Sequence, residues 1–147
     1  MLEKLFAYAL LSKQGFIPIT EYVKYLGDCF LQHQSNALLL DLEYCSGDIH
    51  KAVELINLHV LNTPSFSYDD FGKYLFGELG SVYNSDNGEI HSFAKKIYEL
   101  WKALPHEVQD KEPFWSLSYA DDPLSWGDEE QTRELYQAAF DFYNHVD

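Results

Sequence analysis

The stretch EIHSFAKKIYELWKALP, residues 89–105, decides the fold class. Its apolar side chains recur every three or four positions, which is the period of an α-helix that buries one face. Pro105 ends the pattern, because proline lacks the amide hydrogen that a helix interior needs. We expect a helix from about Glu89, with a buried stripe made of Ile90, Phe93, Ala94, Ile97, Leu100, Trp101 and Leu104.

The same period continues on the N-terminal side of this stretch. Residues 2–13 form one such pattern, and others follow Thr20, Asp48 and Ser67, which are residue types that cap the start of a helix. Residues 36–45 are an apolar run that fits either a short buried helix or a strand. The run contains no β-branched residue, which favours the helix.

The C-terminal side contains a break and one more helix. Residues 110–127 are expected to be irregular, because they contain the helix breakers Pro113, Pro123 and Gly127. Asp128 is then expected to cap the last helix. The fold class that follows is all-α: a single compact bundle of about six helices, with an irregular segment before the last helix. A chain of 147 residues fits one domain, residues 1–147.

The charge of the chain is concentrated in its C-terminal part. The formal net charge is −14, of which −9 falls in residues 107–147 and −5 in the 106 residues before them. A hydrophobic content of 46% excludes a disordered acidic tail, which would lack the apolar surface to offset chain entropy. A folded surface of this charge attracts a basic partner and repels polyanions.

Aromatic side chains lie among these carboxylates. Tryptophan and tyrosine supply large contact areas in protein interfaces, while acidic groups supply fast association and specificity. We therefore expect a partner-binding surface formed by Trp115, Tyr119, Asp121, Asp122, Trp126, Asp128, Glu129, Glu130 and Glu134.

The motifs of common catalytic and metal sites are missing from the sequence. The six histidines form neither an HExxH motif nor an ExxH pair, and no glycine-rich loop carries the Lys-Ser or Lys-Thr of a phosphate site. The carboxylates between Asp121 and Glu130 could hold a hard cation, but their spacing differs from that of an EF-hand loop. Cys29 and Cys45 have no metal-site spacing and are expected to be small hydrophobes rather than a disulfide. We expect no catalytic residue, no metal site and no cofactor.

Nucleic acid and membrane are poor candidate partners. Arg133 is the single arginine, so the chain has little means of gripping phosphate with two parallel hydrogen bonds. Residues 1–13 include an early Glu3 and lack the core and cleavage site of a signal peptide, and no segment reaches the length that spans a bilayer. A cytoplasmic location is the expectation.

In size, charge and helical pattern the whole chain resembles the immunity proteins that bacteria use against their own secreted nuclease toxins. The resemblance is to the class and rests on no diagnostic motif. It implies tight binding to a basic toxin nuclease domain over the surface that handles RNA or DNA. Asp128, Glu129 and Glu130 would then take the place of substrate phosphates, with Trp126 and either Trp115 or Tyr119 as anchors.

Other interpretations stay open at this point. The interface could instead involve residues 67–89, which also carry charge. An acidic regulatory or adaptor module, or a phage-type inhibitor, would use the same physics with another partner. An enzyme would need a site assembled from distant histidines and carboxylates, and it predicts a concave pocket that holds a perturbed titratable group.

Overall fold

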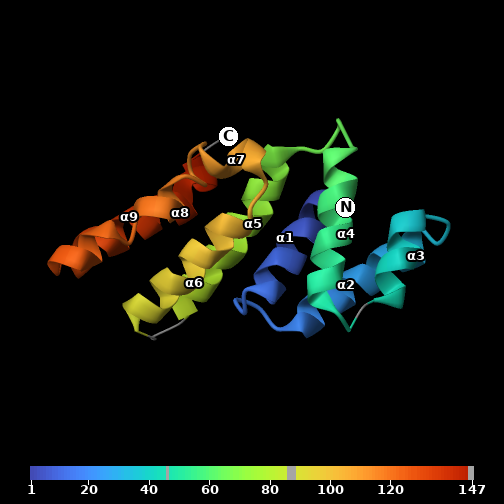
Figure 1. Ribbon diagram of the computed structural model, residues 1–147, viewed down its shortest axis with the longest axis horizontal. Coiled ribbons are helices and arrows are strands. Elements are labelled where there is room, and N and C mark those ends of the chain that lie inside the picture. Colours follow the sequence, from blue (N-terminus) through green and yellow to red (C-terminus); the bar gives the residue numbers. More distant parts are fainter. Residues whose placement is uncertain (46, 86–88, 146–147) are drawn as a thin grey trace. The chain divides into compact units, whose positions relative to one another are not determined.

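The computed structural model describes residues 1–45, 47–85 and 89–145 (Figure 1). The prediction of an all-α protein is confirmed, since these residues contain helices and no strand. They form nine α-helices and two 3-10 helices, so the expected number of about six is wrong. Contacts divide the chain into two units, Met1–Leu75 and Phe76–Asp147, and the division falls within one helix, α5 (Tyr68–Ser85).

The first unit is built around α1 (Leu2–Lys13), which packs against α2 (Ile19–Gln32) and α4 (Ile49–Leu61). The short α3 (Ala37–Tyr44) packs against both α2 and α4. The boundaries of α1 agree with the prediction, and the run at 36–45 is helical. However, α1 buries more than one face, because Ala7 and Leu11 are as inaccessible as the predicted stripe. Phe6 extends this core by stacking on Phe71 with ring centroids 5.2 Å apart.

Side-chain caps start several of these helices as the sequence predicts. Asp48 accepts a hydrogen bond from the Lys51 amide at 3.1 Å, and Ser67 accepts one from the Asp70 amide at 3.1 Å. The predicted cap at Thr20 is wrong, because α2 starts at Ile19, two residues before the Glu21 start that a Thr20 cap implies. Pro18 occupies the N-cap position with φ −64° and makes no side-chain hydrogen bond there.

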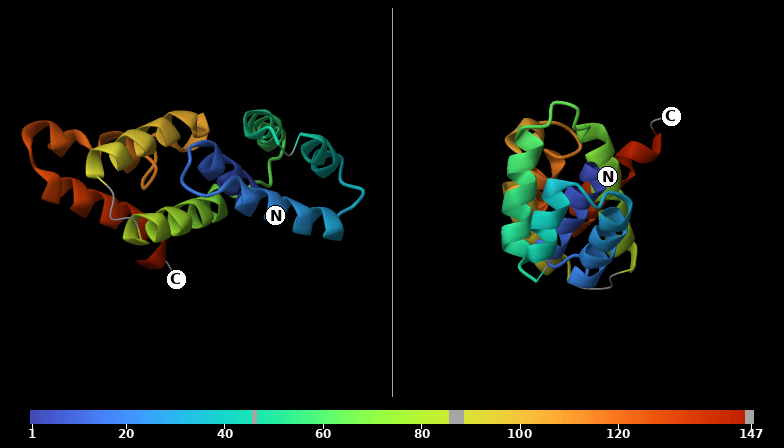
Figure 2. Two further views of the ribbon diagram at one scale, coloured as in Figure 1. Left: turned by 90° about the horizontal axis from the view of Figure 1, so that it is seen from below. Right: turned by 90° about the vertical axis from the view of Figure 1, so that its right-hand side faces the viewer.

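The second unit has an aromatic core. The part of α5 that follows Leu75 lies beside α6 (Ile90–Ala103), where Tyr83 and Phe93 have ring centroids 5.4 Å apart (Figure 2). Phe93 also meets Tyr136 of α9 (Glu129–Asp141) edge to face at 5.4 Å. At one point α5 and α9 approach closely, because a Cβ on Gly80 would meet the Cβ of Phe140 at 3.5 Å.

The segment predicted to be irregular is largely helical. After α7 (His106–Gln109) come α8 (Ser116–Tyr119) and a 3-10 helix, η1 (Asp122–Trp126), and the expectation of irregular backbone over 110–127 is wrong there. Buried residues recur every third position, at Phe114, Leu117, Ala120 and Pro123. These turns are short because Pro113 and Gly127 interrupt the backbone, but packing on α6 and α9 stabilises them.

Trp101 differs from its predicted role as a core residue. It is half-buried, and its indole Nε1 donates a 3.0 Å hydrogen bond to the Gln109 carbonyl. The Gln109 side-chain amide donates in return to the Trp101 carbonyl at 3.0 Å. This reciprocal pair ties α7 to the end of α6, so Trp101 joins two helices instead of filling the interior.

Candidate binding site

The predicted site residues between 115 and 126 lie along one segment of short helical turns, and several of them are exposed to solvent. Trp115 is 49% exposed and Trp126 is 64% exposed, and Asp122 is exposed between them. We call Trp115, Tyr119, Asp122 and Trp126 the aromatic ridge.

The N-terminal end of the aromatic ridge is held in place by polar contacts. Trp115 and Tyr119 meet edge to face with ring centroids 5.4 Å apart. The Tyr119 hydroxyl donates a 3.0 Å hydrogen bond to the Glu112 carboxylate, which also accepts from Ser116. The exposed ring of Trp115 and the half-buried ring of Tyr119 are therefore preorganised, which reduces the entropy lost when a partner covers them.

The C-terminal end of the aromatic ridge is a helix stop centred on Gly127. Gly127 has the left-handed backbone angle φ 81°, which side chains other than glycine adopt at a cost. Its amide donates a 3.2 Å hydrogen bond to the Leu124 carbonyl, and the Asp128 amide donates a 2.9 Å hydrogen bond to the Pro123 carbonyl. This pair of hydrogen bonds is that of a Schellman motif. This turn sends α9 back along η1 and α8, with which it is in contact.

The acidic residues of α9 have three different roles. Asp128 caps the helix as predicted, since its carboxylate accepts a hydrogen bond from the Gln131 amide at 3.0 Å. Glu129 forms an ion pair with Arg133 at 3.3 Å. Glu130 and Glu134 are exposed, lie one turn apart and form no ion pair within the part of the chain that the structure describes. In the first turns of α9, the negative charge open to a partner is therefore that of Glu130 and Glu134.

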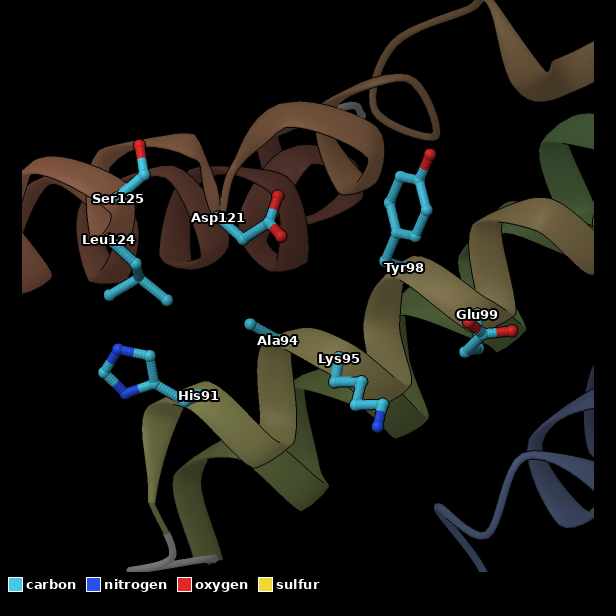
Figure 3. A pocket seen from close by; sticks show the side chains of 8 residues that line it. All are labelled: His91, Ala94, Lys95, Tyr98, Glu99, Asp121, Leu124 and Ser125. Atoms are coloured by element: carbon cyan, nitrogen blue, oxygen red, sulfur yellow. The ribbon is translucent and has the colours of Figure 1, made fainter.

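Asp121 lies apart from the aromatic ridge and lines a pocket. The pocket has a volume of about 370 Å³ and lies between α6 and residues 121–125 (Figure 3). Burial raises the pKa of the Asp121 carboxyl above its usual value, a backbone hydrogen bond partly offsets this shift, and the neighbouring charge of Asp122 adds to it. The other lining residues are His91, Ala94, Lys95, Tyr98, Glu99, Leu124 and Ser125.

Sequence reasoning missed the side of this pocket that α6 supplies. His91, Lys95 and Tyr98 follow one another at helical spacing, and Glu99 lies one turn after Lys95, which indicates that they share one side of α6. The spacing could have shown this face, but not that residues 121–125 lie opposite it. Glu99 pairs with Lys102 at 3.0 Å, and the ring of His91 contacts the capping carboxylate of Glu89.

Nothing in the described residues resembles a metal centre, since no group of three or more His, Cys, Asp or Glu side chains could hold an ion there. Cys29 is buried, Cys45 is half-buried, and both are free thiols. Among the described helices, none combines the length and the apolar character needed to cross a membrane.

Comparison of the chain with protein-family models, with curated proteins and with solved structures finds no match. The aromatic ridge, the carboxylates of α9 and the pocket beside α6 therefore carry the functional argument.

Proposed function

We propose that this is a non-catalytic binding protein that neutralises a basic protein partner. Its best-fitting role is that of an immunity protein that blocks a cognate secreted nuclease toxin in the cytoplasm. The observation that supports the proposal is the exposure of Trp115 and Trp126 in one short segment, followed in sequence by Glu130 and Glu134, whose carboxylates form no ion pair among the described residues.

The proposal is supported by the different contributions that exposed tryptophans and surface carboxylates make to binding. Exposed tryptophans are the side chains that most often supply the central binding energy of an interface. Unpaired carboxylates at the surface speed up association with a positively charged partner and disfavour neutral or acidic ones. An RNA- or DNA-binding surface of a nuclease is positively charged, so it has the charge that this surface complements.

An acidic adaptor or a phage-type inhibitor would use the same surface, and the identity of the partner distinguishes these roles. The second candidate from another class is an enzyme, and one observation favours it: His91 and Asp121 line the same pocket. Their ring and carboxylate form no hydrogen bond with each other within the described residues, whereas the His91 ring contacts Glu89. The binding role therefore has the stronger support.

The test captures the partner with the tagged full-length protein and measures both binding and inhibition. The captured basic protein is identified by mass spectrometry, purified and assayed for cleavage of RNA and DNA, with and without one equivalent of this chain. The proposal expects one basic nuclease that is inhibited at a one-to-one ratio. A captured protein that keeps full activity in the saturated complex would contradict neutralisation.

Two double variants that change the net charge equally test whether the partner binds at the proposed surface. Glu130→Gln combined with Glu134→Gln removes the two open carboxylates of α9, and it should weaken binding at least tenfold if each contributes about 0.7 kcal/mol. Glu43→Gln combined with Glu54→Gln changes the net charge equally at exposed positions of α3 and α4. Equal losses in both double variants would show that only net charge matters and that the proposed surface is wrong.

A further inference from the structure

The pocket beside α6 is mostly apolar but has a carboxylate in its wall. Ala94 and the aliphatic side chain of Leu124 line it together with the ring of Tyr98. In Figure 3 the Asp121 carboxylate points into the space between α6 and its own segment. A volume of about 370 Å³ accommodates one large side chain of another protein.

No cation among the described residues forms an ion pair with Asp121. In Figure 3 the Lys95 side chain extends away from it. The remaining charged groups around the pocket already have partners, since Glu99 pairs with Lys102 and His91 contacts Glu89. The Asp121 carboxylate has a backbone hydrogen bond but no counter-charge, and its partial burial is unfavourable because burial removes water from it.

The Tyr136 hydroxyl is a buried polar group in this part of the unit. Tyr136 is fully buried, and its hydroxyl has no hydrogen-bond partner within the described residues. Burial raises the pKa of Tyr136, and the negative charge of Asp121 raises it further, so the two groups lie near enough to interact. A cation bound at Asp121 would relieve the unfavourable charge that burial leaves there.

We propose that this pocket receives a lysine or arginine side chain of the basic partner, with the aliphatic stem against Leu124 and the cationic head at Asp121. The inference rests on the proposed function and adds the residue type that the partner inserts. Long basic side chains suit such a pocket because their stems are apolar while their heads are charged.

Other occupants fit the pocket less well. An acidic side chain would meet the like charge of Asp121, and a purely apolar or aromatic one would leave that carboxylate without a counter-charge. A basic side chain fits both the apolar wall and the charge of Asp121.

The experiment uses small probes with the full-length protein, so it does not depend on knowing the partner. Nα-acetyl-arginine methylamide is titrated at about pH 7.5 and followed by two-dimensional amide NMR, with Nα-acetyl-norleucine methylamide as the uncharged stem. The expected result is a set of shifts centred on Ala94, Leu124 and Ser125, with the norleucine probe at least about fivefold weaker.

Asp121→Asn and Asp122→Asn form the matched pair, since the two carboxylates are neighbours and only Asp121 lines the pocket. Asp121→Asn should weaken the arginine probe about fivefold or more, and Asp122→Asn less than about twofold. Asp121→Asn should also raise the unfolding temperature at neutral pH, because it removes an unfavourably buried charge. If Asp121 had a purely structural role, Asp121→Asn would instead lower the unfolding temperature.

Three results would overturn the inference: equal affinity for both probes, shifts spread over α9 instead of the pocket, or unchanged arginine binding in Asp121→Asn. Failure of the inference is distinguishable from failure of the proposed function. If the captured partner binds Asp121→Asn as tightly as wild type, the inference fails while the binding role stands. If the arginine probe binds at Asp121 but no basic protein is inhibited, the pocket stands and the neutralising role fails.

Discussion

The amide of Asp128 donates a 2.9 Å hydrogen bond to the carbonyl of Pro123, and this bond joins the two halves of the proposed binding surface. It closes the turn at Gly127 between the exposed Trp126 and the acidic start of α9. The turn thereby sets where the aromatic ridge ends and where the carboxylates begin. Its stability is open to a direct test.

Gly127→Ala should destabilise the protein by about 1 kcal/mol, because alanine adopts the left-handed backbone region at a cost. No atom lies within 4 Å of the added Cβ, so the cost is one of backbone conformation rather than of packing. Gly77→Ala is the matched control, since it also meets no atom within 4 Å but lies inside α5. It should stabilise the protein by up to about 1 kcal/mol. Urea unfolding measures both, and two changes of the same sign would contradict this account of the turn.

Trp126→Ala should weaken partner binding by about 2 kcal/mol or more while changing the free energy of unfolding by less than about 0.5 kcal/mol. The side chain is 64% exposed, so the folded protein loses little packing without it. Trp101→Phe is the contrasting variant, because it removes the indole donor to Gln109 and should cost about 1 kcal/mol of stability with unchanged binding. Calorimetric titration and urea unfolding separate the two effects. Loss of binding in Trp101→Phe alone would place the interface elsewhere.

Association with the partner should slow as salt rises, while dissociation changes little. Carboxylates act over a distance during the encounter, and ions screen that attraction beyond about 10 Å at 0.1 M salt. Between about 0.05 M and 0.5 M salt we expect the association rate constant to fall roughly tenfold or more. Surface plasmon resonance gives both rate constants, and a constant association rate would remove the argument for electrostatic attraction by Glu130 and Glu134.

Tyr136→Phe should leave stability unchanged or raise it by up to about 1 kcal/mol. The wild-type hydroxyl is buried without a hydrogen-bond partner among the described residues, so its removal relieves an unsatisfied polar group. Tyr119→Phe is the control, since it breaks the 3.0 Å bond to Glu112 and should cost about 0.5–1 kcal/mol. Thermal unfolding compares them. A loss of 2 kcal/mol or more in Tyr136→Phe would reveal a hydrogen bond at that hydroxyl.

Stability should fall below pH 4.5 partly because of Glu89. Its side chain caps α6, and hydrogen bonds from the His91 amide and ring, with one from the Ser92 amide, lower its pKa from 4.5 to about 2. A carboxyl whose pKa is lower in the folded state stabilises the protein fully above its unfolded pKa, and that contribution disappears as pH falls toward 2.

Glu89→Gln should therefore flatten the dependence of unfolding free energy on pH between about 2 and 4.5. The matched control is Glu54→Gln, which removes an exposed carboxylate from the middle of α4, where it caps no helix end. Chemical unfolding at a series of pH values gives the slopes. If the unfolding free energy of Glu89→Gln depended on pH as steeply as that of the wild type, the Glu89 cap would not be the cause of the loss of stability in acid.

The sequence by itself determined the helical class, the limits of α1, the helix at 36–45 and the caps at Asp48, Ser67 and Asp128. These features depend on neighbours within a few residues, because helix period and capping are local properties of the chain. The sequence also shows directly that acidic and aromatic residues are concentrated after residue 106.

The tertiary structure decided which of those residues share a surface. The turns of α8 and η1 exist because Leu117 and Ala120 find buried positions, and such short helices are not stable from local propensity alone. The same packing turns Asp121 toward α6 and leaves Asp122 in solvent, although the two are adjacent in sequence. Contact between segments far apart in the chain depends on how side chains pack in three dimensions, and no spacing in one segment specifies that.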